Sequence, residues 1–555
     1  MDIDNAIQAA LQHYQSGNLP DAEIIFSKVL KEQPSNKEVS YFLGIVYAEM
    51  GKYDLAIPYL RESLAFSIDN AYACFMLGVI YQNKGLLNNA VQCFQTTLEI
   101  DPEFADAYEK LGECYQNNDI FEDAISYYKK ALLLKPHCAT LYDNIGVCLH
   151  KTGQLDEAMK YYQKALHLDP RLSHVYNNLG NVFDAQGFYE KAIDCYQQAL
   201  QSNQNNAISY INLGLASQKR GKNSEALVFF HKAVELDKNN AEAHSNMSFS
   251  LMASGDLKRG WEEFQWHWKT REGINFQKSL QKPRWTGFDI SGCTVLLHDG
   301  AEGSIGFGDT IQFIRYVSSM AEQCAKVIFE CKKELIPLLR NVQGISKIME
   351  FGEKACAFDV HCFILDLPFL FHCSLDNIPS KIPYIHVAPQ LIKEWGEKII
   401  YYQPSFKIGL VWGQGHVGEF GKCCSLVTYS PLGFSNHITF FSLQKGDSAK
   451  QAKTSPQGMN IIDLTDDIHD FADTAALIEN LDLVISVDTS VAHLAGALGK
   501  PVWTLLPFAS CWRWMLDRED SPWYPTMRLF RQPSPGDWES VIIKVRDELR
   551  KLLNV

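Results

Sequence analysis

Two polar residues, Asp488 and Thr489, interrupt an apolar stretch near the C-terminus that reads LVISVDTSVAHLAGALGKPVW, and His493 follows four residues after Thr489. The apolar run before Asp488 predicts a buried strand, and the run after Thr489 predicts a helix. A helix that begins at such a bend directs its backbone amides and the positive end of its dipole toward the two polar side chains. The pattern therefore predicts a site for an anionic group such as a diphosphate.

The same three residues also have a structural explanation. Asp488 can cap the helix that follows it, and His493 can pack beneath that helix. Both explanations remain open at the level of the sequence.

These residues need a scaffold, and the second half of the chain predicts one in which strands alternate with helices. CTVLLHDG predicts a strand, DTIQFIRYVSSMAEQ a helix and AKVIFEC the next strand, which is the order of a parallel α/β sheet. A second series runs from FKIGLVWGQG to PVWTLLP, so two α/β halves should face each other across a cleft at the carboxyl ends of their strands. The Gly-rich segment before Asp309 lacks the G-x-G-x-x-G spacing, which argues against a nicotinamide enzyme.

The first half of the chain is built from repeats of 34 residues, with small residues at fixed positions. Gly and Ala allow two helices to approach closely, and the pattern resembles that of tetratricopeptide repeats. It predicts an α-superhelical solenoid whose concave face holds a peptide or protein partner. The alanines are Ala22, Ala56, Ala90, Ala124, Ala158, Ala192 and Ala226, and the glycines are Gly44, Gly78, Gly112, Gly146, Gly180 and Gly214.

Four asparagines occupy one position in the last four repeats: Asn144, Asn178, Asn212 and Asn246. In the tetratricopeptide fold this position faces the concave groove, and an Asn amide both donates and accepts hydrogen bonds. The row resembles the asparagine ladder of O-linked N-acetylglucosamine transferases, which implies a peptide-binding role. Asn is also common at this position in such repeats, so this explanation stays open.

Composition limits the function classes. The formal net charge of -14 and the absence of a basic run argue against a nucleic-acid partner. The sequence shows neither a secretory signal nor an apolar stretch of the roughly 18 residues that a membrane span requires, so a cytoplasmic protein is expected. The 15 cysteines are scattered and do not predict a disulfide framework.

Five segments carry a resemblance to a known family: GDTIQFIRY, GLVW, SLQKG, DFADTAALIENLDLVISVDTSVAHLAGALGKPVW and WRWMLDREDSPWYP. They resemble the C-terminal domain of bacterial tetratricopeptide proteins related to ADP-heptose:lipopolysaccharide heptosyltransferases. The resemblance covers nearly all of residues 284–540. It implies the two-Rossmann glycosyltransferase fold called GT-B, and tetratricopeptide-linked protein glycosyltransferases, including those that modify flagellin, are similar to the whole pattern.

The repeats and this resemblance together imply four segments. Residues 1–270 form the tetratricopeptide solenoid, and residues 271–284 are a linker. Residues 285–395 form the first Rossmann-like half on the acceptor side. Residues 396–555 form the second half, which binds a nucleotide sugar and ends in a C-terminal helix.

The resemblance also implies roles for individual residues. Asp488, Thr489 and His493 would line the donor site. Gly308 and Asp309 match the family's Gly-Asp pair, in which the Asp is the general base toward the acceptor hydroxyl. The loop before Asp309, which contains Gly306, is two residues longer than the family's usual form. Alternatively, Asp309 is the N-cap of the following helix, and the two readings are compatible.

Positive charge on the leaving diphosphate would come from Lys445 and Lys422, which are candidates by family position, and no metal ion or other cofactor is required. After GLVW the chain departs from the family pattern, since the usual Asn, His and Arg-Ser are missing. Gln414 is a substitute donor ligand there. This departure leaves the identity of the donor, and turnover itself, open.

A cluster of Trp512, Arg513, Trp514 and Trp523 has two interpretations. Indole rings can form a pocket for a sugar or a base. Such clusters are more often a structural lid over the sheet.

Three functions fit these observations. The favoured one is a protein O-glycosyltransferase that uses a nucleotide sugar and holds a protein acceptor, for example a flagellin-like protein, in the repeat groove. The second is an interaction scaffold with a degenerate, inactive GT-B domain, and the third is a glycan or lipid-sugar transferase. Repeat arrays often dimerise, so a homo-oligomer is also considered, although the sequence indicates no interface.

Overall fold

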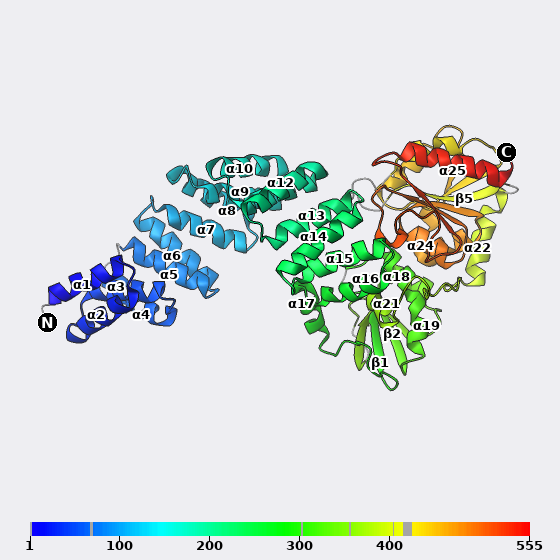
Figure 1. Ribbon diagram of the computed structural model, residues 1–555. Coiled ribbons are helices and arrows are strands. Elements are labelled where there is room, and N and C mark those ends of the chain that lie inside the picture. Colours follow the sequence, from blue (N-terminus) through cyan, green and yellow to red (C-terminus); the bar gives the residue numbers. More distant parts are fainter. Residues whose placement is uncertain (1–2, 67–69, 301–303, 354–356, 403–404, 414–423) are drawn as a thin grey trace. The chain divides into compact units, whose positions relative to one another are not determined.

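The computed structural model describes residues 3–66, 70–300, 304–353, 357–402, 405–413 and 424–555 (Figure 1). The chain divides into two compact units, Met1–Gln204 and Asn205–Val555. None of the helices within the described ranges is both long enough and apolar enough to cross a membrane.

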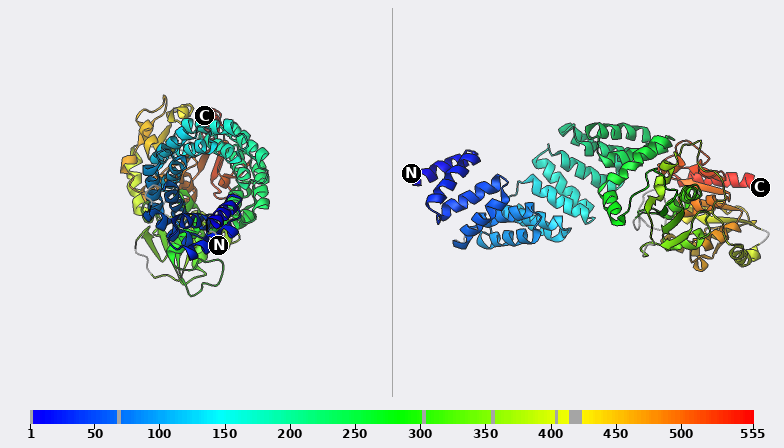
Figure 2. Two further views of the ribbon diagram at one scale, coloured as in Figure 1. Left: turned by 90° about the vertical axis from the view of Figure 1, so that its left-hand side faces the viewer. Right: turned by 90° about the horizontal axis from the view of Figure 1, so that it is seen from below.

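The first unit consists of helix pairs that wind around a common axis (Figure 2). Each pair is one repeat, as the 34-residue period predicts. The helices are α1 (Ile3–Gln15), α2 (Leu19–Glu32), α3 (Lys37–Glu49), α4 (Tyr53–Phe66), α5 (Ala71–Asn83), α6 (Leu87–Ile100), α7 (Ala105–Asn117), α8 (Phe121–Leu134), α9 (Ala139–Lys151), α10 (Leu155–Leu168), α11 (Ser173–Ala185) and α12 (Tyr189–Ser202).

The recurring glycine brings the two helices of a repeat together. A Cβ atom built on Gly146 of α9 would lie 2.5 Å from the ring of Tyr162 on α10, and Gly112 has the same relation to Tyr128. Tyr162 and the recurring Ala158 are fully buried. The predicted close approach of the helices at this glycine is therefore confirmed.

The second unit begins with two further repeats and continues into the α/β part. The repeat helices are α13 (Ala207–Lys219), α14 (Asn223–Leu236), α15 (Ala241–Ala253) and α16 (Leu257–Phe264). A 3-10 turn, η1 (Gln265–Lys269), and helix α17 (Arg271–Leu280) follow, so the segment 271–284 that was expected to be a linker is largely helical. One hydrophobic cluster joins Met252 and Trp261 of the last repeat to Val295 and Ile311 of the α/β part. The last repeat therefore shares a core with the sheet domain.

The first sheet is parallel, with the strand order β3-β2-β1-β4. Its strands are β1 (Thr294–His298), β2 (Lys326–Cys331), β3 (Lys347–Glu350) and β4 (Val360–Phe363). The connection from β1 to β2 contains α18 (Phe307–Phe313), η2 (Ile314–Tyr316) and α19 (Val317–Ala321), and the later connections contain η3 (Lys333–Leu335), α20 (Ile336–Leu339), η4 (Ile364–Asp366) and α21 (Leu367–Leu370).

The second sheet is also parallel, with the order β10-β9-β8-β5-β6-β7. Two parallel α/β halves are thus present, as the alternating pattern predicts. The strands are β5 (Phe406–Val411), β6 (Ile438–Ser442), β7 (Ile461–Asp463), β8 (Leu483–Val487), β9 (Val502–Leu506) and β10 (Met527–Arg531). The longer helices are α22 (Pro389–Ile399), α23 (Phe471–Glu479), α24 (Ser490–Ala497) and α25 (Trp538–Leu553), and the 3-10 turns include η6 (Leu426–Leu432), η7 (Asp447–Lys453), η8 (Thr465–Asp467) and η9 (Trp512–Trp514).

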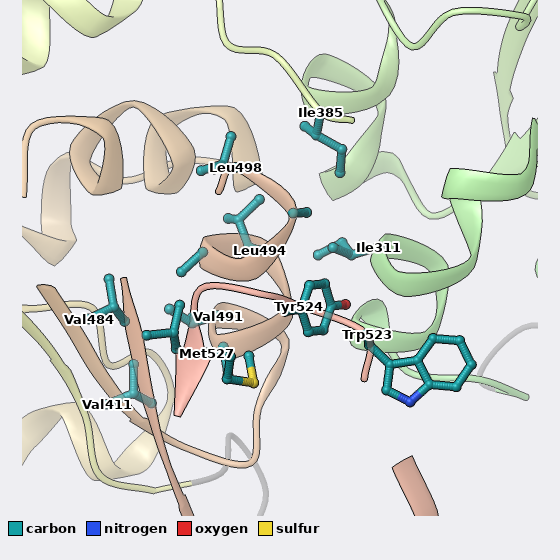
Figure 3. Packing of buried hydrophobic residues seen from close by; sticks show 14 of the residues in the cluster. Ile311, Ile385, Val411, Val484, Val491, Leu494, Leu498, Trp523, Tyr524 and Met527 are labelled. Carbon is teal, nitrogen blue, oxygen red and sulfur yellow. The ribbon is translucent and has the colours of Figure 1, made fainter. Parts of the chain in front are cut away.

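The two halves meet through an apolar contact between α18 and α24. Figure 3 shows Ile311 of α18 facing Leu494 of α24, with Tyr524 beside them. All three side chains are fully buried. This contact stabilises the packing of the two helices, at whose starts the polar residues lie.

The substitution Gly146→Val should destabilise the first unit by about 1–3 kcal/mol, because the added methyl groups would enter the space of the Tyr162 ring. Thermal unfolding followed by circular dichroism measures this loss. Gly292→Ala is the control, since a Cβ atom there meets nothing within 4 Å. Equal unfolding curves for the Gly146 variant and the unmodified protein would contradict the close-packing argument.

Candidate active site

Asp488 lies at the point of the second sheet where ligands of α/β proteins usually bind. It directly follows β8, whose neighbour in the sheet is β5, and the connections from these two strands run in opposite directions. The carboxyl ends of such a strand pair form a crevice. Gln444 shapes this crevice from β6, because its Oε1 accepts hydrogen bonds from the backbone N–H groups of Trp412 (3.0 Å) and Gly413 (2.8 Å).

The bend after Asp488 leads directly into α24. Thr489 is the N-cap residue of this helix, but its side chain does not cap it, and its hydroxyl lies 3.0 Å from the hydroxyl of Ser486. Thr489, and not Asp488, therefore occupies the N-cap position of α24. The half-buried Asp488 and the amides of the first turn of α24 lie together at the carboxyl end of β8.

His493 is buried within α24 rather than exposed in the crevice. One ring nitrogen, Nδ1, is 2.9 Å from the hydroxyl of Tyr524, and the ring stacks on Trp514. Burial lowers the pKa of His493 well below its usual value, and the nearby guanidinium groups of Arg513 and Arg315 lower it further. This environment fits the alternative in which the neutral imidazole packs beneath the site.

The Gly-Asp pair of the first half lies at the start of α18. Gly306 is the N-cap residue, and Asp309 is the third residue of the capping turn. The Oδ2 atom of Asp309 accepts the backbone N–H of Gly306 at 2.8 Å, so Asp309 supports the cap without being the N-cap itself. Gly308 faces the second half, because a Cβ atom there would lie 2.8 Å from Cδ2 of His493.

Arg513 connects the two halves at this point. Its guanidinium forms an ion pair with Oδ1 of Asp309, donates to Oε1 of Gln312 at 2.8 Å, and is only 14% exposed. Burial disfavours the charged guanidinium, but the carboxylates of Asp309 and Asp488 and the hydrogen bond to Cys511 outweigh this effect and raise the pKa of Arg513. One cation thus interacts with a carboxylate from each half.

Gln312 has a further unusual feature beside this cation. It is fully buried, yet its amide Nε2 has no hydrogen-bond partner within the described ranges. A buried donor without a partner costs free energy unless a ligand or water satisfies it. The Arg513–Gln312 pair is therefore a candidate position for oxygen atoms of a ligand.

A pocket of about 840 Å³ opens beside Asp309 and Arg513. Its lining includes Gly300, which follows β1, and Phe363, the last residue of β4, so the pocket lies at the carboxyl ends of these two strands. The two strands are neighbours in the first sheet, as β8 and β5 are in the second. The volume of the pocket lies within the roughly 300–1,000 Å³ of typical ligand sites. The opposite wall comes from the last two repeats and from the helical segment after them.

Lys445, one of the predicted donor-side cations, is bound to backbone carbonyls. The ammonium of Lys445 donates to the backbone carbonyls of Thr465 and Ile468, the latter at 2.8 Å, and thereby supports the loop after β7. Lys422 and Gln414 lie outside the described residues. A donor role for these three residues remains a prediction.

The four ladder asparagines are on the first helices of their repeats: Asn144 on α9, Asn178 on α11, Asn212 on α13 and Asn246 on α15. All four are half-buried. The Nδ2 group of Asn178 donates to Oδ1 of Asp143 at 3.0 Å. The peptide-binding role of the row is not tested by these contacts.

Sequence reasoning missed the two features that define the site. Arg513 was considered only as part of a tryptophan cluster, in which Trp514 and Trp523 are fully buried and Trp512 reaches the pocket. The sequence feature that could have indicated a role for Arg513 is its position between two tryptophans, in a segment that carries the family resemblance. Helix α17, which forms part of the pocket wall, lies in the segment 271–284 that the sequence predicts to be a linker.

Three family models match parts of the chain. Tetratricopeptide repeat matches residues 7–71, and cilia and flagella-associated protein 70 C-terminal domain matches residues 58–270. Glycosyltransferase family 9 (heptosyltransferase) matches residues 435–513, a segment that contains Asp488, α24 and Arg513. The chain thus carries tetratricopeptide repeats followed by a heptosyltransferase-type segment in an α/β domain. This confirms the resemblance and supports a glycosyltransferase-like function.

Individual proteins are similar to parts of the chain. Protein FlbA of Caulobacter vibrioides is 23% identical over 327 residues, which are 54% of this chain and 53% of FlbA, so the chain spans about half the length of this relative. Among solved structures, MamA is 27% identical over 31% of this chain and 94% of its own, with a TM-score of 0.29. A tetratricopeptide repeat protein from Parabacteroides merdae is 17% identical over 45% of this chain and 98% of its own, with a TM-score of 0.37.

Gly308→Ala should destabilise the second unit by about 1–3 kcal/mol, because the new methyl group would press on the His493 ring and separate α18 from α24. Denaturant unfolding measures the change. Gly306→Ala is a matched control two residues away, where the Cβ atom would lie 3.4 Å from Asp309 Oδ2. The packing argument fails if both variants are equally stable.

Stability should also fall as the pH drops below about 6.5, the usual value for histidine. Buried His493 stays neutral in the folded chain, while the same imidazole takes up a proton in the unfolded chain, so acid favours unfolding. Over the range between the two pKa values, His493 contributes a slope of about 1.4 kcal/mol per pH unit.

The measurement compares the free energy of unfolding of the unmodified protein with that of His493→Asn between pH 5 and 7.5. The variant should show the smaller slope, while His437→Asn, at an exposed position, should leave the slope unchanged. Because His298 and His361 also have lowered pKa values, only the difference between the curves reports on His493. Parallel curves for the unmodified protein and His493→Asn would refute the assignment.

Proposed function

We propose that the second unit is a glycosyltransferase that moves a sugar from a nucleotide-sugar donor to a hydroxyl group of a protein acceptor. The observation that carries this proposal is the ion pair that joins Asp309 of the first half to the guanidinium of Arg513 in the second half. A pocket large enough for a ligand opens at the same place. The match of residues 435–513 to the heptosyltransferase family supports the reaction class.

In the proposed step, the acceptor hydroxyl oxygen bonds to the anomeric carbon of the sugar. The bond from that carbon to the diphosphate oxygen breaks, and its electron pair leaves with the nucleotide diphosphate. The hydroxyl proton passes to the carboxylate of Asp309, which has the chemistry of a general base and lines the pocket. The step as written is balanced without a metal ion.

The charge that develops on the diphosphate needs a fixed positive partner. We assign this role to Arg513 together with the N-terminal amides of α24. Arg513 is held on three sides by Asp309, Gln312 and Cys511. When the diphosphate accepts hydrogen bonds from Arg513, Oδ1 of Asp309 is released toward the acceptor hydroxyl.

The acceptor is proposed to be a protein because the pocket is continuous with the repeats. Gln218 of α13 and Phe249 of α15 belong to its wall, so a chain segment that follows the repeat helices can reach Asp309. A flagellin-like protein is one such acceptor. A glycan acceptor would use the same cleft without the repeats.

Asp309→Asn should lower the rate of sugar transfer by about 10²- to 10⁴-fold, because an amide cannot accept the hydroxyl proton at neutral pH. The purified protein is offered a panel of nucleotide sugars, and both nucleotide release and mass gain on co-expressed proteins are followed. Asp289→Asn, an exposed carboxylate outside the pocket, is the control.

Each outcome decides a separate point. An unchanged rate for Asp309→Asn would show that another group is the base. Failure of the unmodified protein to bind any nucleotide sugar would exclude the transferase and favour an inactive domain that serves as a scaffold. Transfer to glycans but not to proteins would replace the protein acceptor.

A further inference from the structure

The pocket beside Asp309 is built by three separate parts of the second unit. The repeats contribute Gln218, Phe249 and Met252, the segment after them contributes Trp268 and Phe276, and the α/β halves contribute Gly300, Ile305 and Arg513. Much of the remaining lining is aromatic, as in Phe249, Trp268 and Phe276. Asp309 therefore belongs to the wall of a largely apolar chamber.

One ladder residue leads directly to this chamber. Asn246 and Phe249 are three residues apart on α15 and so lie on the same helix face. Gln218 of α13 donates from Nε2 to the backbone carbonyl of Asn246 (3.1 Å) and to the hydroxyl of Ser250 (2.7 Å), which ties the two repeat helices together at the pocket wall. A peptide backbone bound to the Asn246 amide would therefore continue over Phe249.

The charges of the lining disfavour an acidic occupant. Arg513 is neutralised by its ion pair with Asp309, which leaves Glu272 as a further negative charge. Burial lowers the pKa of His267, so this imidazole adds no positive charge near neutral pH. The chamber is larger than any single side chain, so it can hold a hydroxyl-bearing residue together with its neighbour.

We propose that this pocket is the acceptor subsite and that it selects a Ser or Thr that is flanked by a bulky apolar residue. The apolar side chain packs against Phe249, Trp268 and Phe276, while the Asn246 side chain binds the extended backbone that leads to it. The hydroxyl then lies at Asp309. This inference rests on the proposed glycosyl transfer, because it concerns the acceptor of the same site.

Binding of peptides tests the subsite without a donor. Short fluorescent peptides with one central Ser are compared, with Phe, Leu, Gly or Asp as the flanking residue. Phe and Leu peptides should bind the full-length protein about tenfold more tightly than the Gly peptide, and the Asp peptide should bind most weakly. Equal affinities across the four peptides would overturn the proposal.

Two variants identify the wall that is responsible. Phe249→Ala should lower the affinity for the Phe and Leu peptides by about tenfold and leave the affinity for the Gly peptide unchanged. Val228→Ala, at an exposed position on α14, is the control and should change none of these affinities. Glu272 is exposed, so Glu272→Lys should fold normally, and it should improve binding of the Asp peptide several-fold. Glu397→Lys, on the exposed face of α22, is its control.

The same proteins separate the subsite from the reaction. If peptide selectivity holds but no nucleotide sugar is turned over, the proposed transferase is wrong and the peptide site stands. If nucleotide sugars are turned over but flanking residues make no difference, the subsite is wrong and the transferase stands. Competition by oligosaccharides in place of peptides would show that the aromatic walls bind a sugar acceptor.

Discussion

The buried guanidinium of Arg315 holds the two α/β halves together. It donates to the backbone carbonyls of Gln312 (2.9 Å), Pro379 (3.1 Å) and Trp523 (2.8 Å) and to the hydroxyl of Tyr384 (3.0 Å). Pro379 and Tyr384 lie between the two sheets in the chain, and Trp523 lies in the second half. A buried charge is tolerated only when its donors are paired, and loss of one partner of a buried pair typically costs about 3–5 kcal/mol. Arg315 therefore makes one arrangement of the halves much more favourable than others.

The geometry of the site follows from this arrangement. With α18 held against α24, Gly308 contacts His493, and Asp309 reaches Arg513 across 204 residues of sequence. Asp309 could not pair with Arg513 if the halves separated. The apolar contact of Ile311 and its neighbours stabilises the pair without directing it, whereas the hydrogen bonds of Arg315 fix its orientation.

Much of the fold could be predicted from the sequence, because it rests on periodic patterns. The repeat glycines, the two parallel sheets and the bend at Asp488 all have local signals in spacing or hydropathy. Arg513 could not be assigned in this way, since its partner Asp309 is distant in sequence and a long-range ion pair has no local signature. For Lys445, the family position predicts a donor-side cation. It cannot reveal that the ammonium already donates hydrogen bonds to two backbone carbonyls.

The division of the chain at residue 204 separates the first six repeats from the last two, which belong to the same compact unit as the sheets. Helices α15 and α16 share a hydrophobic core with the first sheet through Met252 and Trp261, and together with α13 they form part of the wall of the pocket. The predicted boundary at residue 270 would place this wall outside the α/β domain. Because the wall and Asp309 belong to one compact unit, the distance from the last repeats to the proposed base is set by packing and not by a linker. The proposed acceptor-binding surface thus belongs to the same compact unit as the proposed base, which is what precise positioning of a hydroxyl requires.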